Sequence, residues 1–410
     1  MVNVGIDLHK TQFTVCVRRE GGEQFVQYPT TEEGYRRFLQ TAAVWKGSGE
    51  EVRVGVESTG NTRYFKSRLE AAGIRVTVIN TLRFKVVNES VNKTDKHDAA
   101  TIVDFLEKDM LPESRLCSRE SEQLRRLLKA RATLVRAEVV IKNQIHALLT
   151  AEGLEDVKGS LQSKKGRQQV LDTLNQCVNG LVAQPLFETI EQVERNVNSI
   201  EKQIEALVAG DRVVELLMTI PGCGPINAWT IRAYTDEIKR FTSAKKYTAY
   251  AGLVPWVQNS NETFHYGKIT KRGPRELRTA FVQVVMGMRR MKNKLAPWRL
   301  MQRHEALKKG KIPGVAIIAT ARKVATIIWH MLTEEVEFDV NKMVDEKLAK
   351  KSEEMGGLRL VQQAMIEGEE KPVVVMVENK DKNEKSVKKR VVIKDKKNSG
   401  VAGIKRSKVG

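Results

Sequence analysis

Apolar and polar residues alternate along the first eighty positions in a way that predicts a β-sheet. Five short runs of β-branched and other apolar residues each have the length of one strand, at residues 2–8, 13–17, 24–28, 52–57 and 75–79. Helical spacing appears between and after these runs, in segments 30–45, 64–72 and 94–106. Because the elements follow the order β-β-β-α-β-α-β-α, we predict a mixed α/β sheet with helices on its faces.

Helical periodicity replaces the strand pattern between Glu120 and Ala209. In the second half of this region, apolar residues alternate four and three positions apart through three heptads, at Leu186, Ile190, Val193, Val197, Ile200, Ile204 and Leu207. The polar stretch 152–166 predicts the turn between two long helices. Two arrangements satisfy this pattern equally: a helical hairpin within one chain, and a coiled coil that joins two chains.

A third pattern begins at Ile220, where Pro, Gly, Cys, Gly and Pro lead into a new helical segment. This spacing is typical of the hairpin in a helix-hairpin-helix element, where Gly222 and Gly224 let backbone N–H groups approach a phosphate. Short Gly-Pro turns between helices are also common elsewhere. The motif alone therefore leaves a phosphate contact and an ordinary turn both open.

The charge of the chain narrows the class of partner. Lys and Arg outnumber Asp and Glu by 70 to 50, which gives a formal net charge of +20. Residues 371–410 contain thirteen Lys and Arg against four Asp and Glu, so the first 370 residues still carry +11. A chain this basic along its length attracts polyanions, and nucleic acid is the first partner to expect. The Lys-rich composition beyond residue 380 predicts a disordered tail.

The cysteines and the apolar runs argue against other classes. Cys16, Cys117, Cys177 and Cys223 lie far apart, with no C-x-x-C pair and no grouped histidines, which argues against a zinc site and fits a reduced setting. No signal peptide precedes the first strand, and the longest apolar runs, such as 315–321, are far shorter than a membrane span. We therefore expect a soluble cytoplasmic protein with no membrane partner.

Carboxylates at unusual positions form the first candidate site. Asp95 and Asp98 lie three residues apart just after Thr94, a residue type that caps helices, so they share one face of a first helical turn. Acids there ordinarily complement the helix dipole, which is the alternative explanation. Asp7 and Glu57, however, lie in strands rich in Val and Ile, where an unpaired charge is costly to bury.

Together the four carboxylates can hold two Mg²⁺ ions astride a phosphodiester, which predicts phosphoryl-transfer chemistry on nucleic acid. Each acid alone also has an ordinary explanation, namely an edge strand facing water for Asp7 and a helix cap for Glu57. His9 and His97 lie close to this set in the sequence. For them we expect a surface or supporting role, because Mg²⁺ prefers oxygen ligands.

A cluster of cations marks a second candidate site. Five of them fall within eleven residues, next to a polar stretch that contains Ser260: Lys268, Lys271, Arg272, Arg275 and Arg278. A solvated basic face is the ordinary explanation. The alternative is that the cations clamp a scissile phosphate while the Ser260 hydroxyl attacks it, with Tyr250 and Tyr266 as rival nucleophiles.

The order of these motifs resembles a known family. G-I-D-L-H-K, V-E-S-T-G and K-T-D-K-H-D-A are followed downstream by I-P-G-C-G-P, A-G-L-V-P and G-K-I-T-K-R-G. Over roughly residues 1–335 the chain resembles the IS110-type transposases of bacterial insertion sequences. Asn261 follows Ser260 where that family usually has glycine.

The resemblance implies three domains and a tail. Residues 1–112 are expected to form a RuvC-like, RNase H-type α/β domain with the D-E-D-D set, and residues 113–210 a helical coiled-coil region. Residues 211–340 are expected to form a mainly α transposase domain with a helix-hairpin-helix element and Ser260 as the catalytic serine. Residues 341–410 are expected to be a C-terminal extension with the basic, disordered tail.

The resemblance also implies RNA-guided DNA recombination. In that family a structured noncoding RNA pairs with donor and target double-stranded DNA, and strands are exchanged through a covalent 5′-phosphoserine with Mg²⁺ held by the acids of a partner subunit. We therefore expect Mg²⁺ as cofactor, a homodimer or homotetramer, and action on the bacterial nucleoid. We expect no ATP requirement, since the sequence has no G-x-x-x-x-G-K-[ST] phosphate loop.

Two other functions remain open on the residues alone. A hydrolytic RuvC-like nuclease or Holliday-junction resolvase would use the four acids to activate water, with Ser260 as a phosphate contact only. A relative without catalysis would keep the fold and bind nucleic acid.

Overall fold

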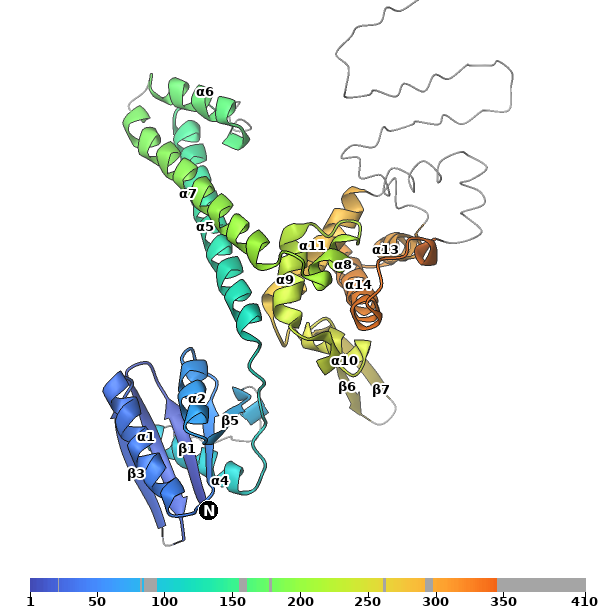
Figure 1. The fold of residues 1–410 in the computed structure, drawn as a ribbon. Helices are drawn as coiled ribbons and strands as arrows, with labels where there is room; N and C mark the ends of the chain where they lie inside the picture. The colour runs from blue at the N-terminus through green and yellow to red at the C-terminus, as the bar shows by residue number, and fades with distance from the viewer. Residues whose placement is uncertain are drawn as a thin grey trace, which may run out of the picture. The chain divides into compact units, whose positions relative to one another are not determined.

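The computed structural model describes residues 1–20, 22–81, 83–84, 94–154, 161–176, 179–260, 263–291 and 298–344, with the backbone alone over 258–260 and 263–266 (Figure 1). The chain divides into two compact units. The first is Met1–Ser118, and the second begins at Arg119, the first residue of a long helix.

The first unit is built on one mixed sheet. Its strands are β1 (Val2–Leu8), β2 (Gln12–Arg19), β3 (Gly22–Pro29), β4 (Val52–Glu57) and β5 (Arg75–Ile79), in the spatial order β3-β2-β1-β4-β5. The three strands β1, β2 and β3 pair antiparallel, whereas β4 runs parallel to both β1 and β5. The predicted mixed sheet is confirmed.

Helices cover both faces of this sheet. The helices α1 (Glu32–Gly47) and α2 (Thr62–Ala71) pack their apolar side chains against one face, where Phe13, Phe38 and Phe65 form the centre of an aromatic cluster. On the other face, α4 (Asp95–Glu107) lies close to β1, because a Cβ atom at Gly5 would overlap the carbonyl oxygen of Ala99. Because the two elements pack this closely, the first turn of α4 lies beside the end of β1.

The second unit begins with a helical arm, made of α5 (Arg119–Ala151) and α7 (Gly180–Leu207). Nε of Arg131 donates to Glu201 at 2.6 Å, whereas Glu152, just after α5, accepts a hydrogen bond from Asn179, just before α7. The C-terminal end of α5 therefore lies beside the N-terminal end of α7, and the two helices are antiparallel. Of the two arrangements left open by the sequence, the structure contains the hairpin within one chain.

The arm carries an additional helix that the sequence did not predict, α6 (Lys164–Leu174). The 152–166 stretch, predicted as a turn, runs into this helix, and residues 155–160 lie outside the described part. The α6 residue Arg167 is buried; it donates to both carboxylate oxygens of Glu194 on α7 and to the carbonyl oxygen of Leu161. This ion pair fixes α6 across the end of the arm (Figure 1).

The rest of the second unit is mainly helical, as predicted, with one two-stranded hairpin. Its elements are α8 (Arg212–Met218), α9 (Pro225–Thr235), η2 (Ile238–Arg240), α10 (Ala244–Tyr250), β6 (Pro255–Ser260), β7 (Thr263–Ile269), α11 (Arg275–Arg290), α13 (Arg299–Gly310), α14 (Pro313–Glu334) and η3 (Asn341–Met343). Leu124, Leu128 and Ile204 of the arm share a core with these helices.

One helix of the described residues, α14, is long and apolar enough to cross a membrane by length and composition. It contains the 315–321 apolar run, which by itself is shorter than a membrane span. Its buried residues, among them Ala321, Val324 and Ile328, pack in the core of the second unit. In this structure α14 is a core helix.

Candidate active site

The ends of two parallel strands bring the first pair of acids together. The register of β1 on β4 pairs Ile6 with Val56, so Asp7 and Glu57 are the next residues on adjacent strands. Side chains alternate between the faces of a strand, so both acids lie on the face that carries Gly5 and Gly55. That is the face covered by α4, since Cβ atoms at these glycines would meet Ala99, Val103 and Ile102.

The first turn of α4 brings the second pair of acids to the same place. Thr94 caps the helix, with its hydroxyl accepting from the backbone N–H of His97 at 3.2 Å, so the predicted helix start is confirmed. Asp95 and Asp98 therefore lie in the first turn, at the end of α4 nearest Asp7. A favourable interaction with the helix dipole does not by itself explain Asp95 and Asp98, because the buried carboxylate of Asp7 lies close to the same helical turn.

The tightest part of the cluster contains Asp7, His9 and Asp95, whose potential ligand atoms all lie within 4.8 Å of one another. Nε2 of His9 lies 2.9 Å from Oδ2 of Asp7 and 3.6 Å from Oδ1 of Asp95. The amide of Gln12 donates to Oδ2 of Asp95 at 3.3 Å. Asp7 is only 6% exposed, whereas His9 and Asp95 reach solvent.

Burial raises the pKa of Asp7 above its ordinary value, and the nearby charges of Asp95 and Asp98 raise it further. The charge of His9 and its hydrogen bond act in the opposite direction and lower that pKa. An ionised Asp7 therefore needs a positive charge beside it. A divalent cation would supply that charge, and a set of carboxylate oxygens at the end of a sheet suits Mg²⁺.

His9 was predicted to have a surface or supporting role, and its contact with Asp7 agrees with a supporting one. His9 lies just after the end of β1, which brings its ring beside Asp7. Glu57 and Asp98 are not among the three residues of the tight group. The strand register and the electrostatic influence of Asp98 on Asp7 nevertheless place both at the same edge.

The predicted phosphate-binding glycines have two different environments. They lie in the connection from α8 to α9, and Gly222 has a positive φ of 86°. A Cβ at Gly222 would lie 2.6 Å from the backbone nitrogen of Met288, so this glycine is needed for packing against α11. At Gly224 no atom lies within 4 Å of the Cβ position. The structure thus explains Gly222 by packing, and a phosphate contact at either glycine stays a prediction.

Ser260 is the last residue of β6, where its backbone pairs with Thr263 of β7. Ser260 was predicted to lie in a polar stretch, and the hairpin was not predicted. Asn261 lies outside the described residues. Among the rival nucleophiles, the Tyr250 hydroxyl donates to the carbonyl oxygen of Tyr234 at 3.1 Å. The side chain of Tyr266 is outside the described part.

The five predicted cations do not form one uniform cluster. Lys268, Lys271, Arg272 and Arg275 are exposed, between the end of β7 and the start of α11. Arg278 is half-buried, and its Nη1 donates to the carbonyl oxygens of Ala251 and Lys271, both at 3.2 Å. Arg278 therefore holds the backbone of this turn in place, while the other four are exposed and have no ion pair with any described residue.

Two family models match the chain. One, described as a transposase and named for the DEDD residues and IS110, matches residues 4–152. The other, described as the transposase IS116/IS110/IS902 family, matches residues 214–298. The first range contains all four acids, and the second contains Ser260 and the five cations.

Relatives cover most of the chain. A probable family 20 transposase of Pseudomonas aeruginosa is 26% identical over 298 residues, 69% of this chain and 84% of that protein. The transposase for insertion sequence element IS1111A of Coxiella burnetii is 25% identical over 342 residues, 81% of this chain and 90% of that one. The pilin gene-inverting protein of Moraxella bovis is 24% identical over 350 residues, 82% of this chain and 97% of that one.

Among solved structures, T. thermophilus RuvC in complex with Holliday junction substrate is similar to part of the chain. The similarity covers 28% of this chain and 99% of that chain, at 15% sequence identity and a TM-score of 0.21.

Proposed function

Because the chain belongs to the IS110 family of insertion-sequence transposases, we propose that it is a DNA recombinase that exchanges strands through a covalent bond between DNA and Ser260. The observation that carries the proposal is that Asp7, at the carboxyl end of the central strand β1, lies close to Asp95 and Asp98 of α4. The pilin gene-inverting relative adds support for exchange over hydrolysis, because inverting a gene requires cut ends to be rejoined.

Asp7, Glu57, Asp95 and Asp98 are the proposed Mg²⁺ ligands, in a RuvC-like domain. The chemistry that Mg²⁺ would supply there is polarisation of the phosphoryl oxygens and stabilisation of the leaving 3′ oxygen. The chain supplies the positions of these ligands, since the strand ends and the capped turn of α4 hold the carboxylates on one face. His9 offsets part of the negative charge on Asp7.

The Ser260 hydroxyl is the proposed nucleophile. Its oxygen forms a bond to phosphorus while the bond from phosphorus to the 3′ oxygen breaks, which leaves a 5′-phosphoserine and a free 3′-hydroxyl. The 3′-hydroxyl of the other strand then attacks the phosphoserine and restores the serine. Each step replaces one phosphodiester by another, so no ATP is required. The exposed cations Lys268, Lys271, Arg272 and Arg275 hold the DNA phosphates during the exchange.

Target choice is proposed to come from a structured noncoding RNA encoded by the element, as the family resemblance implies. Double-stranded donor and target DNA are the other proposed partners. A homodimer or homotetramer is the proposed working form, with the acids of one subunit acting beside the serine of another. This assignment relies on the family and not on any contact between the two units of the chain.

A denaturing gel tests the proposal. The full-length chain is incubated with Mg²⁺, labelled donor and target DNA, and RNA transcribed from the noncoding DNA that flanks the gene. We expect a DNA-linked protein band that disappears in Ser260→Ala and persists in Tyr250→Phe, whose hydroxyl binds a backbone carbonyl. Cut DNA without a linked band would support a hydrolytic nuclease instead. Full strand exchange by Ser260→Ala would refute the assignment of the nucleophile.

A further inference from the structure

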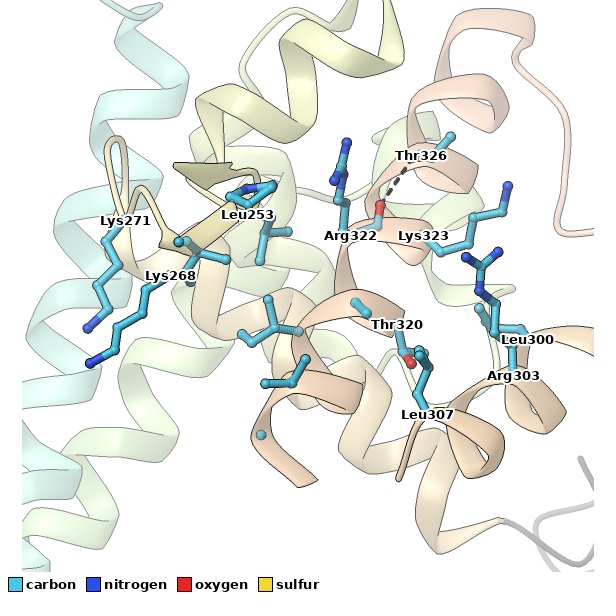
Figure 2. Close-up of a pocket in the computed structure, with 17 residues that line it drawn as sticks. Leu253, Lys268, Lys271, Leu300, Arg303, Leu307, Thr320, Arg322, Lys323 and Thr326 are labelled. Atoms are coloured by element: carbon cyan, nitrogen blue, oxygen red, sulfur yellow. Dashed lines mark hydrogen bonds between the residues drawn. The ribbon is translucent and has the colours of Figure 1, made fainter. Parts of the chain in front are cut away.

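A cavity of about 720 Å³ lies in the second unit, between the β6–β7 hairpin, α13 and α14 (Figure 2). Its volume falls within the range of about 300–1,000 Å³ that is usual for small-ligand pockets. Helix α14 lines it with residues three and four positions apart, from Val315 through Ala319 to Lys323, which form one face of the helix. The cavity is therefore built by three elements that meet in the folded chain.

Cations surround this cavity. Five of the seventeen residues that line it are Lys or Arg and none is Asp or Glu: Lys268, Lys271, Arg303, Arg322 and Lys323. Figure 2 shows Lys268 and Lys271 on one side, and Arg303 and Lys323 on the opposite side. No carboxylate among the described residues lies within ion-pair distance of these five. An anionic ligand would therefore meet positive charge on both sides of the opening.

The floor between the cations is apolar, with Leu253, Ile269, Leu300, Leu307 and Ile318 among its residues. The two hydroxyls that line it are already engaged, because Thr320 and Thr326 each donate to a backbone carbonyl of α14. The remaining lone pairs of Thr320 face the buried His304, whose Nδ1 lies 2.9 Å away and acts as the donor. Such a floor accepts a flat apolar group and does not select for its hydrogen-bonding pattern.

We propose that this cavity receives one unpaired nucleotide of the recombining DNA, with its base on the apolar floor and its flanking phosphates on the two groups of cations. A duplex would use only part of this surface, since its phosphates would reach the cations while its paired bases left the floor empty. A base joined to phosphates on both sides combines an apolar face with anions in the arrangement that the cavity requires. The proposal rests on the proposed function.

The position of the hairpin argues for DNA as the source of that nucleotide. Pro255 and Gly267 line the cavity, and β6 runs from Pro255 to Ser260. Five residues of strand extend about 17 Å at roughly 3.4 Å per residue. At the B-form rise of about 3.4 Å per nucleotide this is about five nucleotides, and fewer in an unstacked strand. The strand attacked by Ser260 is therefore close enough to supply the base.

Equilibrium binding tests the proposal without knowledge of the target sequence. Full-length protein is titrated into a single-stranded DNA oligonucleotide that carries 2-aminopurine, and into a duplex and an RNA of the same length. Ala319→Trp places a bulky side chain in the cavity from its half-buried wall. We expect it to lower the affinity for single-stranded DNA by about tenfold, the loss of roughly one base contact, and to leave duplex affinity unchanged.

A matched pair of charge reversals separates the cavity from general attraction. Arg303→Glu changes a cation that lines the cavity, whereas Lys309→Glu makes the same change in net charge on the exposed end of the same helix. We expect Arg303→Glu to weaken single-strand binding about tenfold more than Lys309→Glu. Melting curves would check that each variant is folded. Both side chains are exposed, so we expect neither reversal to disturb the core.

Three outcomes would overturn the proposal. They are wild-type affinity of a folded Ala319→Trp for single-stranded DNA, equal losses for Arg303→Glu and Lys309→Glu, and binding of RNA but not of DNA. These readouts are independent of the serine, because they are measured without Mg²⁺ and before any strand is cut. A missing DNA-linked band would thus count against the proposed function, and unchanged binding against the cavity.

Discussion

Nε2 of His9 lies 2.9 Å from Oδ2 of Asp7, at the carboxyl end of β1. Asp7 is buried and its surroundings are acidic, so the imidazole is positioned to offset a charge that the fold otherwise penalises. A bound metal ion would meet the same need more fully. This pair therefore gives two ways to test the acidic site, through the carboxylate and through the histidine.

Replacing Asp7 by Asn should separate stability from activity. Because the folded state raises the pKa of Asp7, its ionised form costs stability in the absence of a cation, and this cost grows as pH rises from the unfolded-state pKa to the folded one. We expect Asp7→Asn to melt at or above the wild-type temperature in EDTA. We expect its strand cleavage to fall by about two orders of magnitude or more.

The control for Asp7→Asn is the response to Mg²⁺. Wild-type protein should gain melting temperature when Mg²⁺ is added, because an ion that binds only the folded state stabilises it. Asp7→Asn should gain less. An equal gain in both proteins would show that Asp7 does not hold the ion.

Removing His9 should weaken the site without destroying it. We expect His9→Ala to reduce cleavage by about 10- to 100-fold, the usual cost of losing a group that supports a metal ligand. His9→Gln, which keeps a hydrogen-bond donor but not the imidazole ring, should lie between His9→Ala and wild type. Cleavage rates at several Mg²⁺ concentrations measure the effect. A loss as complete as that of Asp7→Asn would instead make His9 a catalytic group.

The two glycines of the α8–α9 connection should differ in stability. Gly222→Ala places a Cβ 2.6 Å from the backbone of α11 at a φ of 86°, and we expect it to cost about 2–4 kcal/mol of unfolding free energy. Gly224→Ala has open space and an ordinary φ of −79°, so we expect a cost below about 1 kcal/mol. Urea unfolding measures both. Equal costs would contradict the packing role of Gly222.

The arm should lose stability in acid through Glu194. Its hydrogen bonds from Arg167 hold the pKa of Glu194 below its ordinary value. The stabilisation is therefore present above the unfolded-state pKa of about 4.3 and is lost as pH falls through the folded pKa. We expect Glu194→Gln to cost about 1–3 kcal/mol at pH 7 and to flatten the acid limb of the stability curve.

Glu191→Gln is the matched control for Glu194. Glu191 lies on the same helix and pairs with Arg195 at 3.8 Å, with both side chains largely exposed. An exposed pair contributes little, so the pH dependence of this variant should follow wild type. Thermal melts between pH 3 and pH 7 compare the two variants. Parallel curves for Glu194→Gln and wild type would show that the Arg167 pair does not set the acid limb.

Local signals were sufficient for the first unit. Alternation of apolar residues marks all five strands, and Thr94 marks the start of α4 because a cap depends only on neighbouring residues. The placement of Asp7 was likewise foreseeable, since a charge in a Val-rich strand stands out. The sequence also led to the correct helical character of the second unit.

Features that depend on tertiary contacts were not foreseeable. From its sequence context Gly222 resembles a phosphate-binding glycine. The structure shows that α11, more than fifty residues later in the chain, packs against it. Arg278 looks like its basic neighbours until the folded turn presents two carbonyl oxygens to it. The β6–β7 hairpin was missed because its strands lack a clear apolar face, with Trp256 and Val257 both exposed.

The antiparallel arm has a consequence for how this chain can change. Separate cores hold its two ends: Leu124 and Ile204 at the base, and Leu149 and Phe187 near α6. Removing one heptad from each helix between these cores would shorten the arm by about 10 Å and keep both ends in register. The length of the arm can therefore change by whole heptads without altering the packing of either core. The arm is therefore a spacer whose length can change while the residues that pack at its two ends stay the same.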